Sequence, residues 1–236
     1  VDEHLRFLVL QRAALDCCQR MQFAPDIAHC NDWHTSLIPM LLKSVYAWDS
    51  LFSATKSVLS IHNIGYQGIF DSSTTYDIGG EVRHLVAWET LVGGAFNWLR
   101  EGVRHAHRVT TVSPTYAKEI CTPAGGHGID GVLRSRADGV AGILNGVDYN
   151  EWSPATDRYL KHHYTPDDLS GKRATKQQLL DWMNLSVSES TPLLGVVSRM
   201  TVQKGFDLLF DSLPHLLSTR ELGLVALGSG ESHYEN

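Results

Sequence analysis

The strongest chemical signal in the sequence is a pair of cations, Arg199 and Lys204, in the segment 198–205 (SRMTVQKG). Arg199 follows an apolar run that is predicted to be a strand, and Lys204 opens the helix expected after it. A helix N-terminus offers free backbone N–H groups and partial positive charge, which suits phosphate oxygens. A planar guanidinium and a mobile ammonium could together neutralise a diphosphate. The spacing alone fits equally well a solvated Arg and Lys in an ordinary loop.

His34 is the second residue whose type and position could do chemistry. It lies in the segment 30–34 (CNDWH), where a short predicted strand gives way to a helix. A neutral imidazole there could hydrogen-bond a sugar hydroxyl or a developing charge, and Asp32 could cap the helix. Because the chain has 12 histidines, an amphipathic surface position is the commoner explanation of a lone histidine.

Polar and aromatic side chains also follow the strand predicted at 57–61. Asn63, Tyr66 and Gln67 lie within a few residues of the end of this strand. Amide groups and an aromatic ring at such a point suit hydrogen bonding to, and stacking on, a sugar. We therefore expect these three residues to contribute to a substrate site.

Two glycine-containing turns end later strands. Asn145-Gly146 is a turn signal by itself, and its amide could also point into a crevice between domains. Gly228 and Gly230 form a Gly-x-Gly turn that resembles a nucleotide-contacting turn, although such turns are common. No full GxGxxG or GxxxxGK[ST] motif occurs, which argues against a dinucleotide-binding fingerprint and a P-loop kinase.

These residues need a scaffold, and hydrophobic periodicity predicts one. Helices are expected at 3–21, 34–47, 96–105, 172–184 and 204–218, and strands at 26–30, 57–61, 108–112, 140–144, 193–197 and 222–227. This alternation predicts an α/β fold with parallel sheets covered on both faces. Each predicted strand ends in small or polar residues, and ligands of open α/β sheets bind outside the carboxyl ends of the strands.

The overall composition narrows the function classes. Hydrophobic residues make up 43% and charged residues 19%, as in ordinary globular proteins. The formal net charge of −6 provides no basic field for nucleic acid or an anionic membrane. The four cysteines form no CxxC pair, so neither a disulfide framework nor a metal site is predicted. No apolar run is long enough to span a bilayer.

Several ordered segments together resemble the glycogen synthase and starch synthase family of the ADP-glucose type. They are HCNDWH (29–34), IHNIGYQG (61–68), TTVSPTYA (110–117), GVLRSR (131–136), ILNGVD (143–148), EWSPATD (151–157), and VSR (197–199) with QKG (203–205). The resemblance implies a GT-B fold with two Rossmann-like domains, both incomplete here. Residues 1–138 would be the last part of the N-terminal, acceptor-side domain, and residues 139–236 the first part of the nucleotide-sugar-binding domain.

The resemblance also implies an activity and residue roles. The family transfers glucose from ADP-glucose to the non-reducing end of an α-1,4-glucan, with retention and without a metal or cofactor. Arg199 and Lys204 would hold the diphosphate, Asn145 would contact the donor, and His34 would contact the donor glucose near the reacting carbon. Such chemistry depends on positioning and charge stabilisation, because an anionic nucleotide leaves as an oxocarbenium-like sugar forms.

The sequence departs from the family pattern in ways that limit these expectations. The family's Lys-x-Gly-Gly-Leu and Glu-x-x-Gly motifs are absent, and Arg100 stands where a Lys is expected. The chain also starts without Met inside a predicted helix and ends just past a strand. We therefore expect an internal fragment that is inactive by itself, from a protein of the bacterial cytoplasm or, in a plant, of the plastid.

Two other functions remain open at this stage. One is a non-catalytic module that binds a nucleotide sugar, and the other is a GT-B glycosyltransferase of the sucrose or trehalose type. The segments 32–34 and 62–68 argue against the second. The preference for ADP-glucose over UDP-glucose comes from the resemblance alone, and the sequence predicts no oligomeric state.

Overall fold

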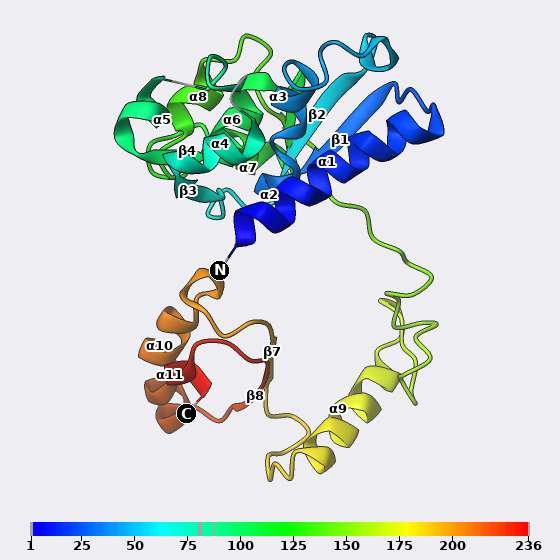
Figure 1. The fold of residues 1–236 in the computed structure, drawn as a ribbon. Helices are drawn as coiled ribbons and strands as arrows, with labels where there is room; N and C mark the ends of the chain where they lie inside the picture. Colours follow the sequence, from blue (N-terminus) through cyan, green and yellow to red (C-terminus); the bar gives the residue numbers. More distant parts are fainter. Residues whose placement is uncertain (1, 80–81, 87, 236) are drawn as a thin grey trace. The chain divides into compact units, whose positions relative to one another are not determined.

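The computed structural model describes residues 2–79, 82–86 and 88–235, and Figure 1 shows the course of the chain. The chain forms two compact units, unit 1 (Val1–Gly146) and unit 2 (Val147–Asn236). The sequence predicts a division after residue 138 instead. The two boundaries differ because Ala141 and Gly142 still pair with the preceding strand of unit 1.

A parallel sheet forms the centre of unit 1. In spatial order it contains β1 (Ile27–Asn31), β2 (Lys56–Ile61), β5 (Arg108–Thr111) and β6 (Ala141–Gly142). Every neighbouring pair of these strands is parallel. Asn31 lies beside Ser60, and Ile61 lies beside Thr111, so the carboxyl ends of the strands meet at one edge of the sheet.

The hydrophobic core of unit 1 lies between this sheet and a set of helices. The helices are α1 (Glu3–Met21), α2 (Asp32–Thr35), α3 (Ile38–Leu42) and α6 (Trp98–His105). In β2, buried Leu59 and Ile61 alternate with half-buried Val58 and Ser60, which is the period of two that places one face of a strand in the core. The thiol of Cys30 is also buried in this core, and burial raises its pKa to about 12.

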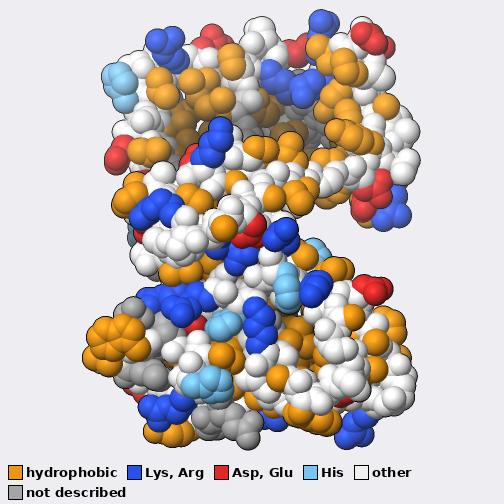
Figure 2. Space-filling view, turned by 90° about the horizontal axis from the view of Figure 1, so that it is seen from above, with side chains coloured by type: hydrophobic (Ala, Val, Ile, Leu, Met, Phe, Trp, Pro, Cys, Tyr) orange, Lys and Arg blue, Asp and Glu red, His pale blue; other side chains and the backbone are white. Residues whose placement is uncertain are grey.

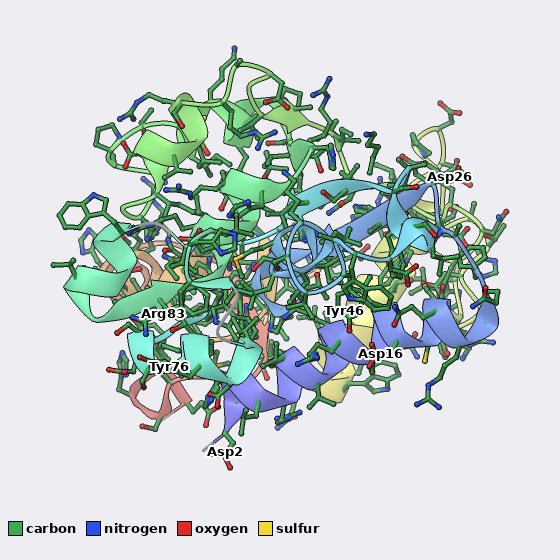
Figure 3. All side chains as sticks on the ribbon, turned by 45° about the horizontal axis from the view of Figure 1, so that its top comes forward. Asp2, Asp16, Asp26, Tyr46, Tyr76 and Arg83 are labelled. Carbon is green, nitrogen blue, oxygen red and sulfur yellow. The ribbon has the colours of Figure 1, made fainter. Side chains whose placement is uncertain are left out.

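Polar side chains fix helix α1 to the rest of unit 1. The Gln11 side chain is fully buried, and its Oε1 accepts the Leu37 N–H at 2.7 Å. The Tyr46 hydroxyl donates to Asp16 Oδ1 at 2.5 Å (Figure 3). Burial, together with this hydrogen bond, raises the pKa of Tyr46 to about 12. A buried amide that is satisfied in this way specifies one docking position for the helix.

Shorter elements complete unit 1. They are η1 (Ser50–Phe52), β3 (Ile69–Asp71), η2 (Ser72–Thr74), α4 (Thr75–Ile78), α5 (Trp88–Gly93), β4 (Ala95–Asn97), α7 (Pro114–Glu119) and α8 (Asp130–Arg134). Strands β3 and β4 pair antiparallel. The helix predicted at 34–47 is instead two short helices, because Pro39 in the first turn of α3 has no N–H to continue the preceding one.

In its described residues, 147–235, unit 2 contains a pair of parallel strands, three α-helices and one 3-10 helix. The elements are α9 (Ser170–Trp182), β7 (Leu193–Val197), η4 (Val202–Lys204), α10 (Phe206–Thr219), β8 (Gly223–Leu227) and α11 (Ser232–Glu235). The helix predicted at 204–218 begins only at Phe206. Its start is delayed because Gly205 has a left-handed conformation, with φ of 77°, which ends the 3-10 turn of η4.

The prediction of an α/β fold with parallel sheets is confirmed by both units. Within the ranges that the structure describes, no helix is long and apolar enough to cross a membrane. On the face shown in Figure 2, Lys and Arg side chains are scattered among apolar and acidic ones.

Candidate functional site

A cavity of about 310 Å³ lies at the carboxyl ends of the strands of unit 1. It is lined by polar side chains and by apolar ones between them: His29, Asn31, Val58, Ser60, His62, Thr110, Thr111, Val112, Ile143, Leu144, Asn145 and Gly146. The parallel register brings these residues together, although they are far apart in sequence. Of the residues predicted for the site, Asn145 lines this cavity.

Hydrogen bonds join the polar side chains of the cavity into two groups. His29 Nε2 lies 2.8 Å from Ser60 Oγ, which lies 2.7 Å from Thr110 Oγ1. His62 Nε2 lies 2.9 Å from Asn31 Oδ1. Because that amide oxygen can only accept, His62 donates through Nε2. Hydroxyls, amides and imidazoles among apolar side chains are the groups that recognise a sugar.

Asp32 connects the ends of β1 and β2. Its backbone is left-handed, with φ of 53°, and its Oδ1 accepts the N–H of His62 at 2.7 Å and that of Asn63 at 3.3 Å. The sequence suggests that Asp32 caps its own helix. The structure shows instead that Asn31 is the N-cap, without a side-chain cap, and that Asp32 accepts backbone N–H groups of the neighbouring strand end.

The loop after β2 is held by a hydrogen bond within the loop and by another to helix α7. Asn63 Oδ1 accepts the Gly65 N–H at 3.0 Å, and the Ile64 N–H donates to the Tyr116 hydroxyl at 3.1 Å. The Tyr66 side chain is exposed and could meet a ligand. The predictions that Asn63 and Tyr66 bind substrate stay predictions, with Tyr66 the more accessible of the two.

The Gln67 side chain makes buried hydrogen bonds that the sequence does not predict. Its side chain is buried, and its Nε2 donates to the carbonyls of Ile64 at 3.1 Å and His127 at 3.0 Å. Its Oε1 accepts a hydrogen bond from Asn97 Nδ2. Since these contacts occupy both ends of the amide, a substrate contact of Gln67 stays a prediction that would require some of them to break.

His34 lies in α2, in an aromatic environment rather than among the residues that line the cavity. Its ring stacks on Trp33, with centroids 4.1 Å apart and planes at 29°, and the edge of Phe7 approaches it at 4.6 Å. Within the described part of the chain, neither ring nitrogen of His34 has a hydrogen-bond partner. The imidazole is therefore fixed by packing while its polar atoms stay free for a ligand.

In unit 2, the structure places Arg199 and Lys204 on one connection between β7 and α10. Arg199 follows the end of β7, and Lys204 is the last residue of η4; both side chains are exposed. Gly205 is the N-cap of α10 and, having no side chain, provides no side-chain cap. Both cations thus precede the first turn of α10 in sequence, although Lys204 ends η4 and does not open the helix as predicted. Their phosphate role stays a prediction.

Gly228 and Gly230 pack against this same connection. A Cβ atom on Gly228 would lie 1.8 Å from the Ser198 carbonyl oxygen, and one on Gly230 would lie 2.1 Å from that of Met200. The backbone of Met200 bonds both Ser229 and Glu231, each at 2.9 Å. The glycines are therefore required by close backbone packing, whether or not they also contact a nucleotide as predicted.

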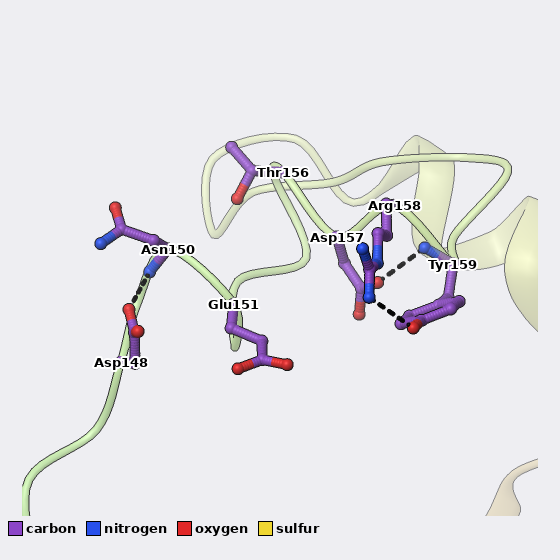
Figure 4. Close-up of a pocket in the computed structure, with 7 residues that line it drawn as sticks. All are labelled: Asp148, Asn150, Glu151, Thr156, Asp157, Arg158 and Tyr159. Carbon is purple, nitrogen blue, oxygen red and sulfur yellow. Dashed lines mark hydrogen bonds between the residues drawn. The ribbon is translucent and has the colours of Figure 1, made fainter.

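A second cavity of about 310 Å³ in unit 2 lies in the loop before α9 (Figure 4). Its lining includes Asp148 and Asp157, whose Oδ1 atoms accept the N–H groups of Asn150 at 2.9 Å and Tyr159 at 2.8 Å. These carboxylates therefore stabilise turns. Among residues 2–79, 82–86 and 88–235, no group of three or more His, Cys, Asp or Glu side chains could hold a metal ion.

A parallel α/β unit with polar side chains gathered at the carboxyl ends of its strands defines a protein that binds its ligand at that edge. Residues 1–135 match the family model described as the starch synthase catalytic domain. The chain therefore belongs to the starch synthase catalytic domain family, as the motifs predicted.

Similar proteins support this assignment over the rest of the chain. The chain is 43% identical to the glycogen synthase of Streptococcus equi subsp. equi (strain 4047), over 99% of this chain and 49% of that protein. It is 42% identical to the glycogen synthase of Geotalea daltonii (strain DSM 22248 / JCM 15807 / FRC-32), over 99% of this chain and 48% of that protein. The chain thus spans about half the length of the curated relatives it matches.

A solved structure gives the same result for the fold. The catalytic domain of starch synthase IV from Arabidopsis thaliana, bound to ADP and acarbose, matches with a TM-score of 0.87 and 33% identity. The match covers 99% of this chain and 48% of that chain. The predicted GT-B class is confirmed by this likeness.

Proposed function

We propose that the protein transfers glucose from ADP-glucose to the non-reducing end of an α-1,4-glucan, with retention at the anomeric carbon. The observation that carries this proposal is the likeness of nearly the whole chain, at a TM-score of 0.87, to a starch synthase domain bound to ADP and acarbose. ADP is the nucleotide part of the proposed donor, and acarbose is an oligosaccharide analogue. Both partners are small molecules or glucans, and no cofactor or metal is proposed.

We assign a separate role to each of the proposed site residues. Arg199 and Lys204 would neutralise the diphosphate of the donor as its bond to glucose breaks. His34 would contact the donor glucose, and Asn145 would contact the donor from the cavity of unit 1. These groups act through position and charge, which suits a reaction in which a sugar cation and an anionic leaving group separate.

We also propose a cellular location for the protein. The similar glycogen synthases come from bacteria, which favours the bacterial cytoplasm over a plastid as the location. A module that only binds a nucleotide sugar would share the same fold. Transfer, rather than binding, is therefore the property that must be measured.

The phosphate role is tested by donor kinetics of the full-length protein and its Lys204→Ala variant, with ADP-glucose and UDP-glucose compared. Loss of a charge-assisted bond to phosphate is expected to weaken the use of ADP-glucose by about 10- to 100-fold in kcat/KM. Lys161→Ala removes another exposed lysine of unit 2 and is the matched control. Unchanged kinetics of Lys204→Ala would remove the diphosphate role from this residue.

A further inference from the structure

The position of the His34 ring depends on Trp33. The two rings are stacked, and the Trp33 side chain is buried with 7% of its surface exposed. Phe7 packs its edge against both rings, at 4.8 Å from Trp33 and 4.6 Å from His34. If the indole moved, the imidazole stacked on it would therefore move as well.

Gly68, in the loop after β2, sets how closely the indole can approach that loop. A Cβ atom on Gly68 would lie 2.4 Å from Trp33 Cε3 and 2.8 Å from Trp33 Cδ2. Real Cβ atoms do not come so close to aromatic carbons, so any side chain at this position would push the indole away. Gly68 also has a left-handed backbone, with φ of 59°.

Neither partner of this contact can easily move. The Gly68 carbonyl accepts the N–H of Trp98 at 3.0 Å, which ties the loop to the start of α6. The Trp33 indole is enclosed by Phe70 at 5.7 Å and by the buried Trp98 at 6.1 Å, in addition to Phe7. In a core packed this tightly, a new methyl group displaces a neighbour instead of filling a space.

We propose that Gly68 is a positioning residue for His34 and acts through the Trp33 indole. The inference rests on the proposed function, in which His34 contacts the donor glucose. The ring nitrogens of His34 are free within the described residues, so its direction is set by this packing and not by a hydrogen bond. Because Gly68 has no side chain, the Trp33 indole can pack against this loop, and the position of the indole sets that of the imidazole.

A variant of Gly68 changes two things, and a second glycine separates them. Gly68→Ala introduces both the strain of a left-handed alanine and the collision with Trp33. Gly139 has a φ of 65°, and nothing lies within 4 Å of the position of its Cβ. Gly139→Ala therefore carries the same backbone strain without the collision and is the matched control.

The first readout is independent of activity. In the full-length protein labelled with ¹³C at histidine, the His34 ring signal, identified by its loss in His34→Gln, is shifted by the ring current of Trp33. Gly68→Ala is expected to move this signal, and Gly139→Ala to leave it in place. If Gly68→Ala does not fold, Gly68→Asn, whose side chain tolerates the left-handed backbone better, places a Cβ atom against the same indole and is expected to move the signal.

The second readout is glucose transfer. A misplacement of about 1 Å can lower turnover by about 100-fold, so Gly68→Ala (or Gly68→Asn) is expected to lower kcat by about 10- to 100-fold, with a smaller change in the donor KM. Gly139→Ala should retain wild-type kcat. An unmoved His34 signal in these variants overturns the proposal, and so does a moved signal with unchanged kcat. Failure of the proposed function is distinct, because the wild-type protein itself would then transfer no glucose.

Discussion

The carboxylate of Asp32 accepts the backbone N–H of His62 at 2.7 Å, across the carboxyl ends of two neighbouring parallel strands. The same oxygen accepts the N–H of Asn63, and the Asp32 backbone is left-handed. One residue thus fixes the start of the helix that carries His34 and the first turn of the loop that carries Tyr66. This contact therefore adds a side-chain link between two strand ends that the sheet already pairs.

Asp32→Ala is expected to destabilise the protein by about 1–3 kcal/mol, because two backbone N–H groups lose a charged acceptor. Asp32→Asn keeps an acceptor oxygen and a side chain that tolerates the left-handed region, so its loss should be smaller. Urea unfolding measures both variants. Asp26→Ala, an exposed aspartate just before β1, is the control. Equal stability of Asp32→Ala and wild type would show that the contact is weak.

His107 should make the stability of the protein depend on pH. Its Nδ1 accepts the Ser57 N–H at 3.0 Å, which requires the neutral ring. Burial lowers the pKa of His107 from 6.5, and four nearby cations lower it further: Lys43, Lys56, Arg108 and Arg136. Because the folded-state pKa lies below the unfolded one, this stability is complete above about pH 6.5 and is lost as the pH falls through the folded-state pKa.

The measurement is urea unfolding between pH 5 and 8 for wild type and His107→Asn. Asparagine can place an acceptor oxygen near the position of Nδ1 but does not titrate. The variant should therefore lose less stability on acidification than wild type. His105, whose pKa is also lowered chiefly by burial, contributes a slope of the same sign to both proteins. Identical slopes in the two proteins would exclude His107 as the titrating group.

Gly228→Ala is expected to destabilise unit 2 by about 1–3 kcal/mol, because the new methyl group would meet the Ser198 carbonyl oxygen. Gly195→Ala, in β7, meets nothing within 4 Å and should change the stability by less than about 1 kcal/mol. Thermal unfolding distinguishes the two. If Gly228→Ala were as stable as Gly195→Ala but bound ADP-glucose more weakly, nucleotide contact and not packing would explain this glycine.

Much of the fold could be predicted from the sequence because its signals are local. The apolar stripe at 3–21 and the strand at 193–197 correspond to α1 and β7 with the same bounds. The predicted helix at 34–47 was wrong because the helical period continues past Pro39, which breaks the hydrogen-bond ladder. Where the hydrophobic period and a proline disagree, as they do here, the proline determines where the helix is interrupted.

The candidate site could be predicted only in part, because contacts across the sheet leave no local signal. The sequence marks His34 and Asn63 by their places after strands, but not the Asp32 bridge between those strands. It also groups Gln67 with ligand-binding residues, whereas burial engages its amide with Ile64, Asn97 and His127. The sequence assigns Gly68 no role beyond its place in the segment 61–68, because its close contact with Trp33 is visible only in the structure.

The most direct test of the account is transfer of labelled glucose from ADP-glucose to glycogen by the full-length protein. We predict that label enters the glucan, that one ADP is released for each glucose, and that Lys204→Ala lowers the rate while Lys161→Ala does not. Binding of ADP-glucose without any incorporation would contradict the account and identify a nucleotide-sugar-binding module instead.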